Sequence, residues 1–186
     1  MFKTRVPRNI IRLTLSSKGM PKGLKETSGL IVISSIVAES AVNTFTSERV
    51  DLQLNPLDNE VFVVYGVDMD ASPPELIPAT TTQVNASIST TQRTSVGGIS
   101  SPNVLANAKI TTQEAAGGAV TNEFASDSAP STQLEYLGII ATNDFFLNIE
   151  GANNTTAKAA SARVYGVRAR ADASVYAALV QSELLS

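Results

Sequence analysis

Three residue types are missing from the 186 residues of this chain: cysteine, histidine and tryptophan. Without cysteine, the chain forms no disulfide, thiolate zinc site, iron–sulfur cluster or cysteine nucleophile. Without histidine, it lacks the commonest general base and the commonest metal ligand. Enzymes that work without histidine need a specific constellation of carboxylates, lysine or tyrosine, and no spacing here indicates one. We therefore expect no enzymatic activity, cofactor, metal or small-molecule substrate, although sites built from oxygen ligands alone stay open.

Charge and long apolar runs are also scarce. Charged residues make up 17% of the chain and apolar residues 43%, a balance that argues against global disorder. The longest apolar run, residues 30–38, is interrupted by Ser34 and Ser35. It falls well short of the roughly 20 residues that a membrane-spanning helix needs. The length and composition predict a single domain with an ordinary core.

Positive charge is concentrated at the N-terminal end. Residues 1–25 contain seven of the 14 basic residues and no acid, so they carry a net charge of +7. The remaining residues hold seven bases and all 17 acids, a net charge of −10. The seven bases of this arm are Lys3, Arg5, Arg8, Arg12, Lys18, Lys22 and Lys25. Such a charge split is typical of an arm that reaches a polyanion or a neighbouring copy of the chain, with a solvated tail as the alternative.

Apolar residues lie between the bases of the arm, among them Ile10, Ile11 and Leu13. The arm therefore has apolar anchors as well as charge. It is suited to lie along an adjacent subunit with its cations facing nucleic acid or the anionic head groups of an internal membrane. Pairing with the acidic bodies of neighbouring copies explains the same pattern, and the sequence does not separate these partners.

Short strands separated by turns are predicted for the rest of the chain. Within residues 45–54, Val50, Leu52 and Leu54 alternate with polar residues. Asn55–Asn59 supplies turn chemistry, and residues 60–69 are β-branched and aromatic, so the sequence predicts a β-hairpin. Further strands are expected at residues 30–37, 81–91, 104–110, 134–141, 145–149 and 162–171. Residues 115–130 are small and polar and are predicted to form a long surface loop with at most a short strand. About eight strands without a βαβ rhythm indicate an all-β sandwich or barrel.

The pattern changes at Asp172, which we expect to cap a short C-terminal helix. In that helix Val175, Ala178, Leu179 and Ser182 fall on one face.

A near-repeat is the most specific internal pattern. Residues 64–71 and 164–171 both begin Val-Tyr-Gly-Val and then carry charges two residues apart. The charges are opposite, with Asp68 and Asp70 in the first segment and Arg168 and Arg170 in the second. Because residues two apart lie on one face of a strand, we hypothesise that the aspartates face the arginines, either on neighbouring strands or across a subunit contact.

Asp68, Asp70 and Glu75 also resemble the oxygen ligands of a calcium loop. They lack the glycine and the closing glutamate of the known helix–loop–helix calcium site. An acidic loop that faces solvent is therefore the preferred interpretation.

Three segments of the body carry a resemblance to a known family. They are Phe45–Leu54 leading into Glu60–Met69, then Leu137–Leu147, and finally Tyr176–Glu183. Together with the basic arm, they are similar to the major capsid proteins of single jelly-roll type found in icosahedral DNA viruses, some of which enclose a membrane. The resemblance implies an antiparallel two-sheet jelly-roll domain at residues 29–186, preceded by a basic arm at residues 1–28. It also implies a virion protein that self-assembles with its own copies, and with other capsid proteins, into an icosahedral shell.

A β-sandwich adhesin or surface-layer component on the outside of a cell is the alternative. Such proteins are also rich in strands and threonine and free of cysteine. The basic arm favours the shell subunit, because an adhesin has little use for a strongly cationic arm.

Overall fold

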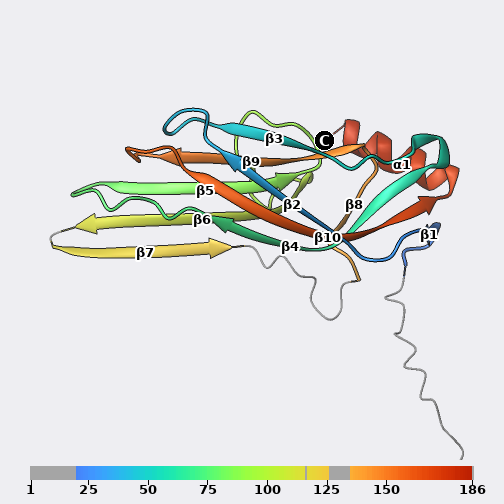
Figure 1. Cartoon of the computed structure of the whole chain (residues 1–186), viewed down its shortest axis with the longest axis horizontal. Coiled ribbons are helices and arrows are strands. Elements are labelled where there is room, and N and C mark those ends of the chain that lie inside the picture. Colours follow the sequence, from blue (N-terminus) through green and yellow to red (C-terminus); the bar gives the residue numbers. More distant parts are fainter. Residues whose placement is uncertain (1–19, 116, 126–134, 186) are drawn as a thin grey trace, which may run out of the picture.

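The computed structural model describes residues 20–115, 117–125 and 135–185, which form ten β-strands, one 3-10 helix and one α-helix (Figure 1). The elements are β1 (Leu24–Glu26), β2 (Ile31–Ala38), β3 (Thr46–Asp51), η1 (Pro56–Asp58), β4 (Glu60–Ala71), β5 (Thr81–Ser89), β6 (Val104–Ala115), β7 (Gly118–Ala125), β8 (Gly138–Ile140), β9 (Asp144–Ala152), β10 (Ala159–Ala171) and α1 (Ala173–Leu184). Five bases of the predicted arm, at positions 3, 5, 8, 12 and 18, lie outside the described residues.

The strands form two antiparallel sheets. Sheet A has the order β2-β10-β4-β8, and β1 lies beside the C-terminal end of β10 on the same edge as β2. Sheet B has the order β3-β9-β5-β6-β7. The chain crosses from one sheet to the other after β2, β3, β4, β7, β8 and β9. This is the connectivity of a jelly roll, so the expected all-β two-sheet sandwich with a short C-terminal helix is confirmed.

Side chains from the two inner faces fill the space between the sheets. On sheet B, alternate residues of β5 and β9 point inward and are fully buried, for example Val84, Ile88 and Phe145. They meet Phe62 and Val164 of sheet A. The two-residue period of the strands puts these apolar side chains on one face, and their burial is the main source of stability.

Sheet A is buried on its outer face as well, where α1 packs. Val61, Val63 and Val167 point outward and meet the helix residues Val175 and Leu179. Asp172 stands at the N-cap position as predicted, but its side chain makes no capping hydrogen bond. Its backbone N–H instead donates to the carbonyl of residue 23, which ties the start of the helix to the segment before β1.

A β-bulge in β4 shifts the alternation of its inward and outward side chains by one residue. Tyr165 of β10 pairs with Gly66 while Gly166 pairs with Val64, so Tyr65 is an extra residue on β4. The shift explains why Val64 and Val67, three residues apart, both point into the space between the sheets.

The predicted hairpin of residues 45–54 and 60–69 is wrong. Both segments are strands, but β3 pairs with β9 in sheet B and β4 pairs with β10 and β8 in sheet A. The connection contains the helix η1 and two buried leucines, Leu52 and Leu54. It is long enough to cross the roughly 10 Å between packed sheets, whereas a hairpin needs a tight turn.

The predicted surface loop at residues 115–130 is also partly wrong. Residues 118–125 form β7, which pairs with β6 along its whole length. Gly117 has a φ of +85°, a conformation that glycine adopts freely and that permits the tight reversal between the two strands. The small and polar residues of this segment have weak strand propensity, so the strand depends on its pairing with β6.

Candidate interaction surfaces

The last part of the predicted arm is attached to sheet A. Leu24 packs with the apolar residues beneath α1, and the strand β1 that it begins pairs with the end of β10. Lys22 and Lys25 are exposed, and Lys25 lies opposite Arg170 in the β1–β10 pair. The described end of the arm therefore presents cations on the surface of the edge of sheet A.

The two near-repeat segments are neighbours, as hypothesised, but their charges do not meet within the chain. Because β4 and β10 are antiparallel, Asp68 lies opposite Arg163 and Asp70 opposite Ser161. Arg168 and Arg170 lie at the other end of the pair. The expectation of aspartates facing arginines on neighbouring strands is thus wrong, since two similar sequences in antiparallel strands place equivalent residues at opposite ends.

The two arginines have other acidic partners near the start of β4. Arg170 forms an ion pair with Asp58 at 2.7 Å, and Arg168 lies 3.7 Å from the carboxylate of Glu60. Arg168 also donates to the carbonyl of Leu52 at 2.9 Å. These contacts hold the connection between β3 and β4 against the end of β10.

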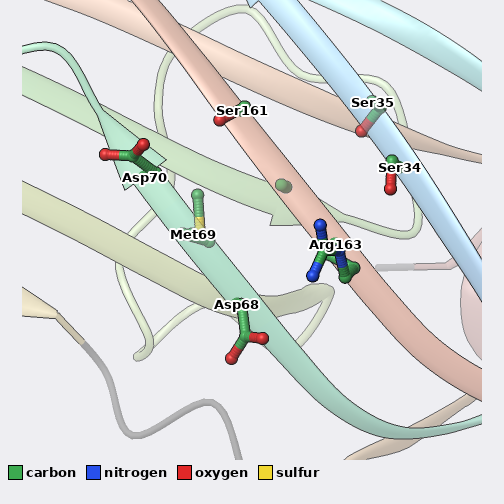
Figure 2. Close-up of a pocket in the computed structure, with 8 residues that line it drawn as sticks. Ser34, Ser35, Asp68, Met69, Asp70, Ser161 and Arg163 are labelled. Carbon is green, nitrogen blue, oxygen red and sulfur yellow. The ribbon is translucent and has the colours of Figure 1, made fainter.

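Arg163 instead lies in an open pocket of about 270 Å³ on the outer face of sheet A, flanked by Ser34 of β2 and Asp68 of β4 (Figure 2). Asp68 accepts a hydrogen bond from the hydroxyl of Tyr165 at 2.8 Å. Contact with Tyr165, and then the charge of Asp68, raises the pKa of Arg163. The pocket therefore brings one cation, Arg163, together with two aspartates, Asp68 and Asp70, on the surface.

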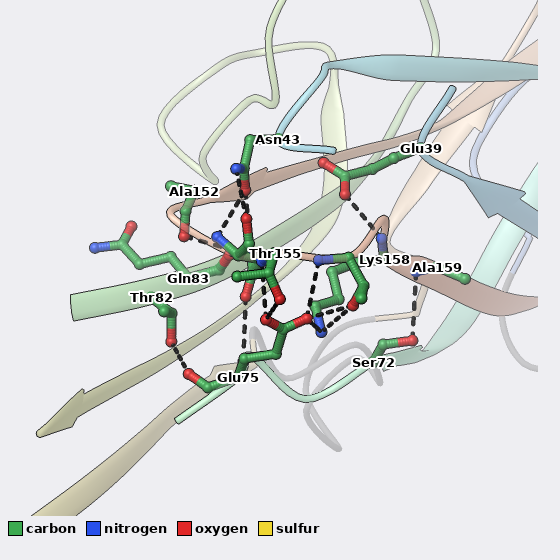
Figure 3. A network of polar contacts seen from close by, with 12 residues as sticks. Glu39, Asn43, Ser72, Glu75, Thr82, Gln83, Ala152, Thr155, Lys158 and Ala159 are labelled. Atoms are coloured by element: carbon green, nitrogen blue, oxygen red, sulfur yellow. Dashed lines mark hydrogen bonds and ion pairs between the residues drawn. The ribbon is translucent and has the colours of Figure 1, made fainter. Parts of the chain in front are cut away.

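The acidic residue Glu75, in the β4–β5 connection, is the centre of a polar network (Figure 3). This connection lies at the opposite end of the sandwich from α1 (Figure 1). Its carboxylate accepts hydrogen bonds from the hydroxyl and the backbone N–H of both Thr155 and Thr156. It also forms an ion pair with the buried Lys158 at 2.9 Å. The hydrogen bonds from Thr155, then those from Thr156 and Lys158, hold the pKa of Glu75 far below its usual range.

Glu39 adds a second carboxylate to this end of the molecule. It is buried and accepts backbone hydrogen bonds from Gly151 at 2.6 Å, Lys158 at 2.8 Å and Thr44 at 3.1 Å. The two glutamates fix the β2–β3, β4–β5 and β9–β10 connections to one another. Glu75 lies in the β4–β5 connection with 23% of its side chain exposed, and its carboxylate is held in this network. Sequence patterns gave no sign of this network, because the groups that form it are far apart in the chain.

Strand β2 is an edge strand without protection. Among the described residues it pairs with β10 alone, so one side of its backbone is free. No charged residue occurs between Glu26 and Glu39. Leu30, Val32 and Ile36 point away from the core and are 64%, 48% and 68% exposed.

The outer side of α1 is a second uncharged surface. The only charged residue of the helix, Glu183, is mostly buried and accepts hydrogen bonds from the backbone N–H groups of Ala141 and Thr142 at 3.0 and 2.9 Å. Burial raises the pKa of Glu183. The outer side carries an apolar pocket of about 560 Å³, lined by Tyr176, Ala177, Val180, Gln181 and Leu185.

The outer face of sheet B has a polar centre and an apolar edge, since Phe124 of the edge strand β7 lies opposite Lys109 and is 64% exposed. Lys109, Asn85 and Glu150 form one row across three strands and line a pocket of about 240 Å³ beside the β5–β6 connection. The side-chain oxygen of Asn85 is buried without a hydrogen-bond partner in the described part of the chain. Amide and charged groups arranged in this way are suited to hydrogen-bond a polar ligand.

The described residues contain neither a cluster of metal ligands nor a membrane-spanning helix. In residues 20–115, 117–125 and 135–185, no three acidic, histidine or cysteine side chains are grouped closely enough to hold a metal ion. The same part of the chain contains no helix with the length and apolar character needed to cross a membrane.

Comparison with known proteins leaves the family open. No protein-family model matches the chain, and neither the curated proteins nor the solved structures include a match.

Proposed function

We propose that this chain is a structural coat protein, a capsid subunit that packs with copies of itself into a closed icosahedral shell of a virion. The observation that carries this proposal is the exposure of apolar side chains on two edge strands at opposite sides of the sandwich. Strand β2 of sheet A lies over β3 and β9, and it exposes Val32 and Ile36. Strand β7 is the far edge of sheet B and exposes Val120 and Phe124. A subunit that tiles a surface needs contacts on more than one side, and exposed apolar strands provide them.

The basic arm supports the same function. Its described end, with the exposed Lys22 and Lys25, lies beside β10. The other five bases precede it in the sequence. In a shell, such an arm faces the enclosed nucleic acid, an internal membrane, other capsid proteins or the acidic body of a neighbouring copy.

Particle size across salt concentration tests the proposal. The purified full chain is examined by light scattering and electron microscopy from about 0.05 M to about 1 M salt, the range over which charge screening becomes strong. The matched variant replaces the five arm bases at positions 3, 5, 8, 12 and 18 by glutamine. We expect the natural chain to form closed shells or lattice sheets at low salt. These particles should dissociate at high salt, and the variant should form fewer of them. A monomer under every condition contradicts the proposal.

A cell-surface adhesin or surface-layer component is the second candidate. The polar pocket of sheet B favours it, because Asn85, Lys109 and Glu150 are suited to the hydroxyl groups of a glycan. The adhesin is supported if the chain is a stable monomer in the particle-size experiment and binds immobilised glycans in a separate assay. Glu150→Ala should then abolish the glycan binding. The location is then the extracellular surface.

A further inference from the structure

We propose that two copies of this chain pair through β2, antiparallel about a two-fold axis at Ser34, so that sheet A runs continuously from one copy into the next. The inference rests on the proposed function and names one contact of the shell. It is carried by an unprotected strand edge whose outward side chains have nearly the same order in both directions.

The backbone of β2 has hydrogen-bonding groups on one side that a further strand could pair with. An edge strand leaves a row of N–H and C=O groups unpaired, and folded proteins usually protect such edges with lysine, proline, a bulge or short length. Strand β2 is eight residues long and contains no proline or charge, and its pairing with β10 is regular from residue 31 to residue 38. A strand from a second molecule satisfies these groups by adding to the sheet.

The outward side chains of β2 set the register. In an antiparallel pair about an axis perpendicular to the sheet, Ser34 at the axis lies opposite its own copy. Val32 then lies opposite Ile36 of the partner subunit, and the reverse contact repeats on the other side of the axis. Directly opposed residues have Cβ atoms about 4.5–5.5 Å apart, so these contacts cover the Val32 and Ile36 side chains that are 48% and 68% exposed in one copy.

Other registers that keep most of β2 paired are less favourable. A shift of one residue brings outward side chains opposite inward ones, which the two-fold symmetry of the sheet forbids. A shift of two residues places Ser35 at the axis, so that Ser34 lies opposite Ile36 and Val32 opposite Ala38 of the partner subunit. Each large apolar side chain then meets a small one, and less apolar surface is buried.

Charge favours a second copy as the occupant of this edge. A two-fold axis brings identical residues together, so any charge at its centre repels its own copy. No charge occurs from residue 27 to residue 38. Among the described residues, Arg163 lies opposite Ser34 one strand inward, with Asp68 beside it. In the proposed pair, the two Arg163 backbones lie three strand spacings apart, about 14 Å, which is beyond the screening length at physiological salt.

Disulfide trapping tests the register, because the chain has no cysteine of its own. Opposed residues of antiparallel strands have Cα atoms about 4.5–5.5 Å apart, within the range of a disulfide. We expect Ser34→Cys to form a covalent dimer on mild oxidation. Val32→Cys and Ile36→Cys should each give no covalent dimer alone and should crosslink when mixed. Ser161→Cys, on the same face but one strand further from the edge, is the control and should not crosslink.

A charge variant provides a second measurement. Ile36→Lys places a cation within the contact, opposite Val32 of the partner subunit, and should raise the dimer dissociation constant at least about tenfold. The control is Leu57→Lys, because Leu57 is 93% exposed on η1, away from β2. Far-ultraviolet circular dichroism confirms that both variants fold.

The outcomes separate this inference from the proposed function. If particles form but Ser34→Cys gives no covalent dimer, the β2 contact is contradicted and the proposed coat function is not. Crosslinking through Ser35→Cys in place of Ser34→Cys overturns the register. If specific dimers form but do not assemble into larger particles, the β2 contact is supported and the shell is contradicted. If the basic arm or another protein covers the edge, the Ser34→Cys dimer does not form.

Discussion

At the scale of single residues, the bulge of sheet A depends on a glycine. A Cβ atom added at Gly166 would lie 2.5 Å from both the carbonyl oxygen of Val63 and the ring of Phe62, closer than packed atoms approach. We expect Gly166→Ala to lower the free energy of unfolding by about 1–3 kcal/mol, the usual cost of overpacking. Chemical denaturation measures the change. Gly29→Ala is the control, since no atom lies within 4 Å of its added Cβ, and equal stability of the two variants would contradict the role of Gly166.

The lowered pKa of Glu75 predicts how the stability of the fold depends on pH. Its pKa in the folded chain lies below the ordinary value of about 4.3 because Thr155, Thr156 and Lys158 donate to its charged form. A carboxyl group with a lowered pKa stabilises the fold above the ordinary pKa, and this contribution is lost as the pH falls below it. The melting temperature of the natural chain should therefore fall more steeply between about pH 6 and about pH 3 than that of Glu75→Gln.

The control for this prediction is Glu48→Gln, because Glu48 is exposed on β3. This variant should follow the natural chain at every pH. Parallel melting curves for the natural chain and Glu75→Gln would show that the network does not stabilise the fold through the charge of Glu75.

At the scale of elements, the sequence predicts strands better than their partners. Alternation located β4 and β10 within a few residues, and Asp172 marked the start of α1. The same alternation placed β3 and β4 in one hairpin, although they belong to different sheets. A periodic pattern reports which face of a strand is buried, whereas its neighbours depend on contacts between residues far apart in the chain. The Glu75 network was not predicted for the same reason, since Thr155 lies 80 residues from Glu75 in the chain.

The attachment of α1 gives a prediction at the same scale. Glu183 accepts two backbone hydrogen bonds from the β8–β9 connection, so Glu183→Ala leaves the N–H groups of Ala141 and Thr142 without this acceptor. We expect a loss of about 1–3 kcal/mol in unfolding free energy and faster hydrogen exchange in α1. Gln181→Ala, an exposed neighbour on the helix, is the control. Unchanged exchange in Glu183→Ala would show that apolar packing alone holds the helix.

At the scale of the whole molecule, the two outer faces of the sandwich have different characters. The outer side of sheet A carries an uncharged edge at β2 and an uncharged helix surface, while the outer face of sheet B carries Asn85, Lys109 and Glu150. The connections at the end remote from α1 are fixed by Glu39 and Glu75. The polar character of sheet B does not extend to its edge, because β7 exposes Val120 and Phe124. Each sheet therefore has one exposed apolar edge strand, and the two edges lie on opposite sides of the body.

A closed shell needs more than one kind of contact, and α1 offers a contact separate from β2. Ala177→Lys puts a cation into the apolar pocket of about 560 Å³ on the outer side of the helix. If that surface joins dimers into a shell, the variant should abolish particles in light scattering while β2-linked dimers remain, because burying an unpaired charge costs several kcal/mol. Ser174→Lys, an exposed position on α1 outside the pocket, should still assemble. Normal particles from Ala177→Lys would place the second contact elsewhere, and Val120 and Phe124 on β7 would be the next residues to change.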